Sequence, residues 1–167
     1  MIGVAVVGAG HWGPNLIANF ERSDRSRVLW VVDRDERRLA AVRARFPSVR
    51  TGTDLLPAMA DEAVDAVVVA TPTQTHFAIA RTALEHGKHV LVEKPLTDSV
   101  ATSRELAELA ERQRRVLMVG HVFLYNAAAR RVKEYVRDGD LGRIYYVSMV
   151  RTNLGPIRVD VHADRPE

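Results

Sequence analysis

Residues 4–33, VAVVGAGHWGPNLIANFERSDRSRVLWVVD, are the stretch that decides the fold. The stretch begins inside an almost wholly apolar segment, residues 2–7, that is typical of a parallel strand covered on both faces. Three glycines with the spacing G-x-G-x-x-G follow at once, and a helix is expected to begin there, because Pro14 suits a first turn, where its missing N–H costs nothing. A second apolar strand, residues 28–32, ends at Asp33. The pattern predicts a strand, a glycine turn, a helix and a strand closed by an acid.

Each part of this pattern suits a dinucleotide. Gly8 permits a tight turn, Gly10 leaves room for a pyrophosphate to approach the backbone, and Gly13 lets the helix pack close to the strand. The free amides and the positive dipole end of the helix then face the phosphates. Asp33 stands twenty residues after Gly13, where a carboxylate binds the adenosine ribose hydroxyls. A lone glycine motif is weak evidence, but this context predicts a dinucleotide site rather than a structural turn.

Composition narrows the class of protein. The chain has 167 residues, a formal net charge of +3 and no cysteine, which excludes disulfides, thiolate metal sites and cysteine nucleophiles. The basic stretch 34–45 is interspersed with acids and apolar residues, so it indicates a solvated helix face rather than a nucleic-acid surface. Apolar runs are too short to span a membrane, and the N-terminus begins a strand rather than a leader. We expect a cytoplasmic protein with no metal, nucleic-acid or membrane partner.

The rest of the chain alternates between helix and strand patterns. Strands are expected over residues 49–51, 65–70, 89–92 and 116–119, and helices over 36–46, 54–60, 75–86, about 98–113 with Thr97 or Asp98 as its cap, and 126–137. Six strands separated by helices predict an α/β fold with a doubly wound, mostly parallel sheet of Rossmann type. Ligands bind at the carboxyl ends of such strands. That rule gathers residues 8–13, Asp33, residues 71–75 and residues 93–95 onto one rim.

Three stretches carry a resemblance to a known family. They are VGAGHWG at residues 7–13, ATP at 70–72 with His76 four residues on, and GKHVLVEKP at 87–95. In this order and spacing they resemble the N-terminal half of the Gfo/Idh/MocA oxidoreductases, over residues 2 to about 160. Residues 12–16 and 153–158 are similar to the branch that includes nucleotide-sugar dehydrogenases. The resemblance implies a dinucleotide-binding Rossmann domain over residues 1–121, and over residues 122–167 a connecting helix and the start of a truncated substrate or oligomerisation domain.

The resemblance also implies a reaction, which is reversible hydride transfer between nicotinamide and a hydroxyl carbon of a sugar, nucleotide sugar or polyol. Lys94 is implied as the catalytic residue that binds the substrate hydroxyl and assists its proton, and a lysine in a partly desolvated cleft suits that task. The alternative for Lys94 is a surface lysine in a proline turn. The alternative for the chain is a non-catalytic dinucleotide-binding or interaction module derived from such a dehydrogenase.

Motif and resemblance together define a candidate cofactor set. Its members are Gly8, Gly10, His11, Trp12, Gly13, Asp33, Arg34, Thr71, Pro72, His76, Glu93 and Lys94. His76 has a capping or packing role as its alternative, His11 a place on the loop surface, and Trp12 a place against the first helix. NAD(H) is expected rather than NADP(H), because Asp33 repels a 2′-phosphate. The opposing interpretation is that Arg34, with Arg37 and Arg38 nearby, places a guanidinium on that phosphate.

The end of the chain is expected to begin a second domain. Residues 144–152 alternate and are rich in valine and tyrosine, which predicts a strand of that domain's sheet. Unpaired, such a strand would expose apolar side chains, so we expect a homo-oligomer that associates through residues 143–158. The family resemblance also implies an aspartate and a histidine acting in the second domain. Asp160, His162 and Asp164 lack the family's spacing, so no catalytic role is transferred to them.

Overall fold

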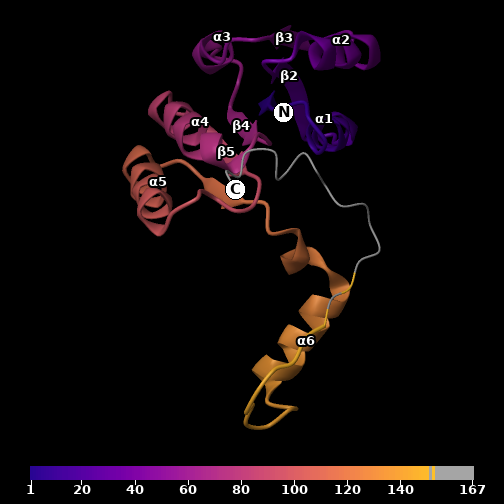
Figure 1. Cartoon of the computed structure of the whole chain (residues 1–167), viewed down its shortest axis with the longest axis vertical. Helices are drawn as coiled ribbons and strands as arrows, with labels where there is room; N and C mark the ends of the chain where they lie inside the picture. Colours follow the sequence, from indigo (N-terminus) through magenta and orange to yellow (C-terminus); the bar gives the residue numbers. More distant parts are fainter. Residues whose placement is uncertain (151, 153–167) are drawn as a thin grey trace, which may run out of the picture. The chain divides into compact units, whose positions relative to one another are not determined.

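The computed structural model describes residues 1–150 and 152. The chain divides into two compact units, one over residues 1–122 and the other from Phe123 onward (Figure 1). Each unit is described by itself.

The first unit is built on a six-stranded sheet in the order β3-β2-β1-β4-β5-β6. Every neighbouring pair of strands is parallel. The central strand β1 pairs with β2 on one side and with β4 on the other, so the strand order reverses there, which is where α/β sheets bind ligands. The strands are β1 (Ile2–Val7), β2 (Ser26–Val32), β3 (Arg50–Gly52), β4 (Ala66–Val69), β5 (His89–Val92) and β6 (Leu117–Val119).

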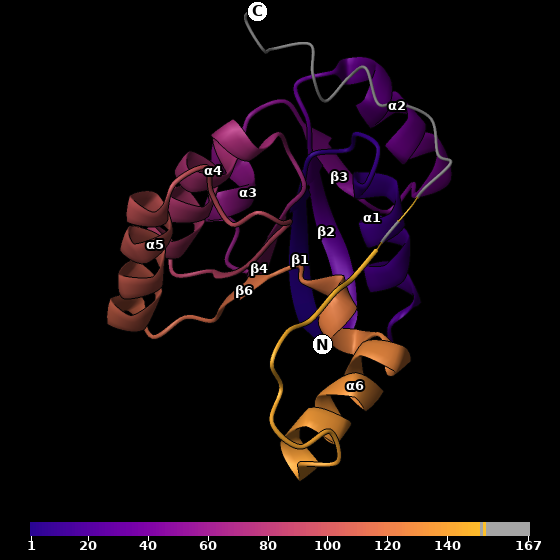
Figure 2. The same cartoon turned by 60° about the horizontal axis from the view of Figure 1, so that its bottom comes forward.

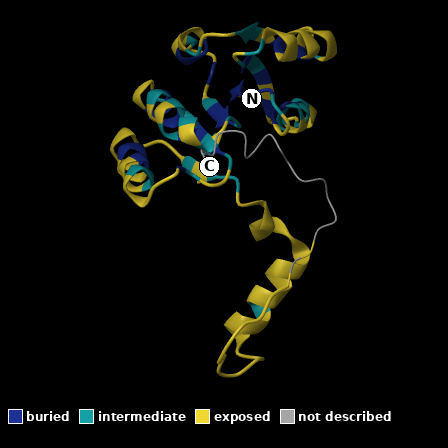
Figure 3. Ribbon diagram, viewed as in Figure 1, coloured by how far each residue is buried: buried dark blue, intermediate teal, exposed yellow. Residues whose placement is uncertain are grey.

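Helices cover both faces of this sheet. The first unit contains α1 (Gly13–Arg22), α2 (Glu36–Arg45), α3 (Leu56–Ala60), α4 (Thr73–Glu85) and α5 (Val100–Gln113). Figure 2 shows α1 and α2 on one side of the sheet and α3, α4 and α5 on the other. Alternate side chains of β1 enter the two cores, since Val4 and Val6 pack with α1 and α2 whereas Ala5 and Val7 pack with the other three helices. The expected doubly wound parallel fold is confirmed, with the buried residues concentrated on the strands and inner helix faces (Figure 3).

Helix ends follow local chemistry. Pro14 lies in the first turn of α1, and α2 ends at Arg45, two residues before Pro47. The expected cap of α5 at Thr97 or Asp98 was wrong, because the Oγ of Ser99 accepts a hydrogen bond from the Thr102 amide at 3.2 Å. Thr97 contributes differently, since its hydroxyl lies 2.7 Å from the hydroxyls of both Thr102 and Ser103.

The second unit begins within a short 3-10 turn, η1 (Val122–Tyr125), and contains α6 (Ala127–Asp138), which begins at an Asn126 cap. The strand expected over residues 144–152 is wrong for the described part, because residues 144–150 and 152 form no strand. A strand requires a hydrogen-bonded neighbour, and within the described residues none pairs with this segment. Its large side chains are exposed: Tyr145, Tyr146, Val147, Met149 and Val150. Residues 153–158, Asp160, His162 and Asp164 lie outside the described residues.

Candidate functional site

The sheet register brings four dispersed segments to one rim. Val7 of β1 lies beside Val32 of β2 and Val69 of β4, and Val69 lies beside Val92 of β5. These four valines end their strands, so the chain leaves the sheet at the same level in all four places. The glycine turn, Asp33, Thr71 and the Glu93-Lys94 pair therefore share the carboxyl edge, as the sequence predicts.

The three motif glycines are required for different reasons. Gly8 has a φ of +99°, a left-handed conformation that glycine adopts without strain. A Cβ at Gly13 would lie 2.1 Å from the Gly8 carbonyl oxygen, so α1 packs on the turn only because Gly13 has no side chain. A Cβ at Gly10 would meet only the guanidinium of Arg38, 3.4 Å away at Nη1. Packing does not demand glycine at position 10, and the open space beside its backbone fits the close approach of a pyrophosphate.

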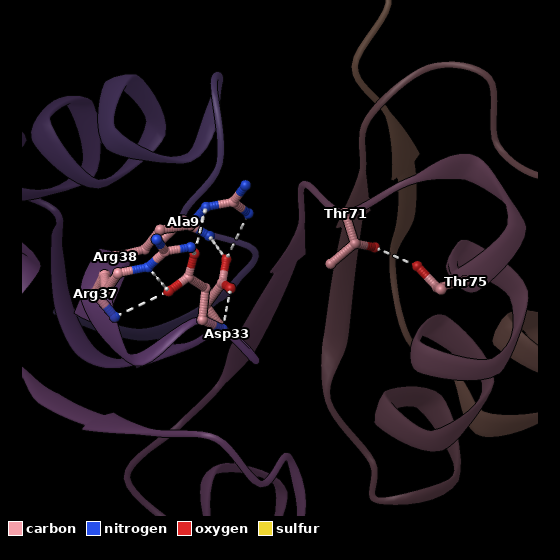
Figure 4. Close-up of polar contacts among 7 residues, drawn as sticks. Ala9, Asp33, Arg37, Arg38, Thr71 and Thr75 are labelled. Carbon is pink, nitrogen blue, oxygen red and sulfur yellow. Dashed lines mark hydrogen bonds and ion pairs between the residues drawn. The ribbon is translucent and has the colours of Figure 1, made fainter. Parts of the chain in front are cut away.

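Asp33 fastens the glycine turn to the end of β2. Its Oδ2 accepts a hydrogen bond from the Ala9 amide at 2.7 Å, and its Oδ1 accepts one from the Asp35 amide at 2.8 Å (Figure 4). The Asp33 side chain is only 8% exposed. Each carboxylate oxygen keeps a further lone pair, so this fixed carboxylate can still accept hydrogen bonds from ribose hydroxyls.

Arg38 is the guanidinium that reaches this carboxylate. Its Nη1 lies 3.5 Å from Asp33 Oδ2 and its Nε lies 3.8 Å from Asp35 Oδ2. Arg34, the arginine singled out from its place next to Asp33, is exposed. The side-chain hydrogen bond from Arg37 holds the pKa of Asp35 below its ordinary value, so Asp35 caps α2 as a carboxylate. Sequence adjacency favoured Arg34, whereas α2 brings Arg38 to the Asp33 carboxylate.

The glycine turn exposes its two bulky residues. His11 is exposed, and Trp12 is 44% exposed at the start of α1. The backbone carbonyl of Trp12 accepts hydrogen bonds from the amides of Asn15 and Leu16, so its main chain belongs to the first helical turn. Trp12 is therefore partly covered and partly exposed, so both its contact with a ligand and its packing against the first helix stay open.

The segment after β4 is held by side chains of α4. The Thr75 hydroxyl lies 2.7 Å from both the Thr71 hydroxyl and the Pro72 carbonyl oxygen (Figure 4). His76 is 1% exposed, with Nε2 2.8 Å from the Thr71 carbonyl oxygen and Nδ1 2.9 Å from the Pro95 carbonyl oxygen. The motif-based residue set omitted Thr75, although its place four residues after Thr71, one helical turn on, is a signal for such a contact.

Lys94 follows β5 directly and its side chain is exposed. Its amide donates to Glu93 Oε2 at 3.3 Å, and its peptide bond to Pro95 is cis. The Glu93 carboxylate lies against Gly120 at the end of β6, where an added Cβ would be 3.2 Å from both carboxylate oxygens. Within the first unit, residues 1–122, Lys94 is exposed, so this unit by itself does not form the partly desolvated cleft expected around the ammonium.

A cavity of about 300 Å³ lies at the other edge of the sheet. It is lined by residues that precede β4, precede or begin β5, or follow α5: Glu62, Val64, Asp65, His86, Gly87, Lys88, His89 and Arg115. None of them belongs to the rim described above. In the described part of the chain, no helix has the length and apolar character needed to cross a membrane.

Comparison with known proteins identifies the relatives of this chain. Residues 2–121 match the family model described as "Oxidoreductase family, NAD-binding Rossmann fold". Inositol 2-dehydrogenase from Rhodococcus jostii is 36% identical over 152 residues, which cover 90% of this chain and 42% of that protein. The matched curated relatives are thus more than twice as long as the aligned part.

Solved structures agree with this match. The structure of GenD2 from gentamicin A biosynthesis, in complex with NAD, superposes with a TM-score of 0.79 at 41% identity, covering 83% of this chain and 40% of GenD2. The WlbA dehydrogenase from Bordetella pertussis, in complex with NADH and UDP-GlcNAcA, has a TM-score of 0.81 at 28% identity, covering 86% of this chain and 42% of WlbA. The expected NAD-binding Rossmann domain is therefore confirmed, and the chain belongs to the Gfo/Idh/MocA oxidoreductase family.

Proposed function

We propose that this chain supplies the cofactor-binding part of an NAD-dependent dehydrogenase that oxidises or reduces a hydroxyl carbon of a sugar, nucleotide sugar or polyol. The observation that carries the proposal is the placement of Lys94 on the rim, two strands along from the glycine turn. Two inter-strand spacings amount to ~10 Å. A single extended dinucleotide bound by its pyrophosphate at the turn reaches that far with its nicotinamide end.

The residues divide the work between binding and chemistry. Gly8, Gly10, Gly13 and the first turn of α1 hold the pyrophosphate, and Asp33 accepts hydrogen bonds from the adenosine ribose. Bound there, NAD would supply the acceptor for the hydride that leaves the hydroxyl carbon. Lys94 donates a hydrogen bond to the hydroxyl oxygen and stabilises its negative charge as the proton leaves and the carbonyl forms.

The cofactor preference proposed is NAD(H) over NADP(H). Asp33 is a fixed carboxylate, both of whose oxygens accept backbone hydrogen bonds, so it cannot turn away from a 2′-phosphate. Arg38 beside it is the group that opposes this preference, because a guanidinium binds phosphate in a bidentate way. Titration calorimetry with both cofactors decides between them, and tighter binding of NADP(H) would contradict the proposal.

Substitution of Lys94 tests the catalytic part. Lys94→Ala in the gene product expressed in full should lower kcat by a factor of about a hundred or more while NAD affinity stays within about threefold, because Lys94 touches substrate and not the pyrophosphate. Lys133→Ala is the matched control, since Lys133 is an exposed lysine of α6. Turnover that survives Lys94→Ala would show that Lys94 is not the catalytic residue. NAD binding without any turnover by the original protein would instead favour the second candidate, a dinucleotide-binding module without catalysis. The exposure of Lys94 in the described residues is the observation in favour of that candidate.

The partner proposed is a second copy of this chain, in the cytoplasm, with association through the segment that begins at Arg143. Its support is the exposed apolar run over residues 144–150, in which the Tyr145 and Tyr146 side chains are 82% and 85% exposed. Sedimentation of the chain with and without residues 143–158 tests this, and an unchanged monomer in both would contradict it.

A further inference from the structure

His76 lies between two loops of the rim. It comes from the first turns of α4 and is 1% exposed. Its ring nitrogens face opposite ways, Nε2 toward the Thr71 carbonyl oxygen at 2.8 Å and Nδ1 toward the Pro95 carbonyl oxygen at 2.9 Å. Thr71 follows β4, and Pro95 is the residue joined to Lys94. One buried ring thus spans the segment after β4 and the loop that carries Lys94.

The chemistry of the contacts restricts what the ring does. A carbonyl oxygen only accepts hydrogen bonds, so each contact is a hydrogen bond only where the ring nitrogen carries a proton. Pro95 is exposed, so without this donor its carbonyl can turn to water instead. The link from Pro95 to α4 therefore depends on a proton at Nδ1 of His76.

The loop around Lys94 has few other attachments. The Lys94 amide makes a 3.3 Å hydrogen bond to its own neighbour Glu93, and Pro95 has no N–H to donate. Leu96 is half-buried, and the Thr97 hydroxyl lies 2.7 Å from the hydroxyl of Thr102 in α5. The contact from His76 therefore links Pro95, the residue directly after Lys94, to helix α4.

We propose that His76 is a positioning residue for Lys94, which donates from Nδ1 to the Pro95 carbonyl and so holds the Lys94 backbone at the rim. This role rests on the proposed function of Lys94 for its effect on turnover, but the positioning itself does not. The geometry assigns His76 an indirect task, because both ring nitrogens are directed at protein carbonyls and the ring is buried.

Two amide variants separate the two contacts. Counted in bonds from Cβ, the amide nitrogen of asparagine matches Nδ1 and that of glutamine matches Nε2. His76→Asn therefore keeps a donor near Pro95 and leaves no nitrogen near Thr71, and His76→Gln does the reverse. His86→Asn and His86→Gln are the matched controls, because His86 is an exposed histidine at the end of the same helix.

Nuclear magnetic resonance of the 167-residue chain gives the first measurement. In His76→Gln the amide signals of Lys94 and Leu96 should move, whereas in His76→Asn they should stay near their original positions. In the gene product expressed in full, kcat should fall by about ten- to a hundredfold for His76→Gln, since a displacement of about 1 Å costs that much, and by less than about threefold for His76→Asn. The KM for NAD should change by less than about threefold in both.

Several results would overturn the proposal. If the two variants disturb Lys94 equally, His76 acts by packing and not by donating to Pro95. If His76→Gln is silent, the contact to Pro95 positions nothing. Where either variant fails to fold, the ring ¹⁵N signals of the unmodified protein decide, since an unprotonated Nδ1 would exclude the donation. Turnover that is insensitive to Lys94→Ala would defeat the catalytic role proposed for Lys94, while the amide signals would still test the positioning role.

Discussion

Gly10 and Gly13 belong to one motif, but their substitution by alanine should have opposite consequences. At Gly10 the added Cβ meets only the end of the flexible Arg38 side chain, 3.4 Å away, and φ is not in the left-handed region. At Gly13 it would lie 2.1 Å from the backbone oxygen of Gly8, which cannot move aside independently of β1. Gly10→Ala should therefore damage binding and spare the fold, and Gly13→Ala should damage the fold.

The structure sets the size of each effect. Gly10→Ala reduces the freedom of the unfolded chain and should change the free energy of unfolding by less than about 1 kcal/mol. Gly13→Ala forces a backbone shift of about 1 Å, and such overpacking costs ~1–3 kcal/mol. At about 2–4 °C per kcal/mol, the Tm of Gly13→Ala should fall by roughly 2–12 °C. The Cβ of Gly10→Ala occupies the approach of the pyrophosphate, so NAD affinity should fall about ten- to a hundredfold, or ~1.4–2.7 kcal/mol.

Thermal unfolding without ligand and titration calorimetry with NAD separate these effects. The two alanine variants are each other's controls, because the same methylene-sized change is made three residues apart. NAD affinity within twofold of the original in Gly10→Ala would refute the assignment of its open face to the pyrophosphate. Equal loss of Tm in the two variants would refute the distinction between a glycine needed for packing and one needed for binding.

Two further predictions concern stability. The indole N–H of Trp30 donates to Asp61 Oδ2 at 2.8 Å and, with the Ala63 amide, holds the pKa of Asp61 below its ordinary value of 3.8. Since the folded-state pKa is depressed, this carboxylate stabilises the fold above pH ~4 and does so less as the pH falls. Asp61→Asn should therefore lower the Tm at pH 7, and the Tm values of the variant and the original protein should converge at acidic pH. A Tm difference independent of pH would contradict this. Ser99→Ala removes the cap of α5 and should lower the free energy of unfolding, measured with denaturant, by about 1 kcal/mol. Asp98→Ala removes no cap and should lower it by less than about 0.5 kcal/mol. Equal losses in the two variants would show that the Ser99 hydroxyl is not the cap that matters.

Much of the first unit could be predicted from local sequence. The apolar runs, the glycine spacing and the proline and glycine stops place the strands and helices of residues 1–120, because each of these signals depends on only a few neighbouring residues. The cap of α5 was misplaced for the same reason that local signals are imprecise, since Thr97, Asp98 and Ser99 are all good caps and only the fold shows which oxygen meets the Thr102 amide. The strand over residues 144–152 failed because alternation indicates a face to be covered and not the neighbour that covers it.

The sequence by itself determined the family, the parallel sheet and the rim on which Gly10, Asp33 and Lys94 meet, because these follow from strand order and from motifs that are contiguous along the chain. Only the tertiary structure decided which arginine lies beside Asp33, that Gly13 serves packing while Gly10 is open, and that His76 joins Thr71 to Pro95. Such contacts depend on side-chain directions and distances between segments that are far apart in the chain. The spacing of residues along the sequence does not predict such contacts.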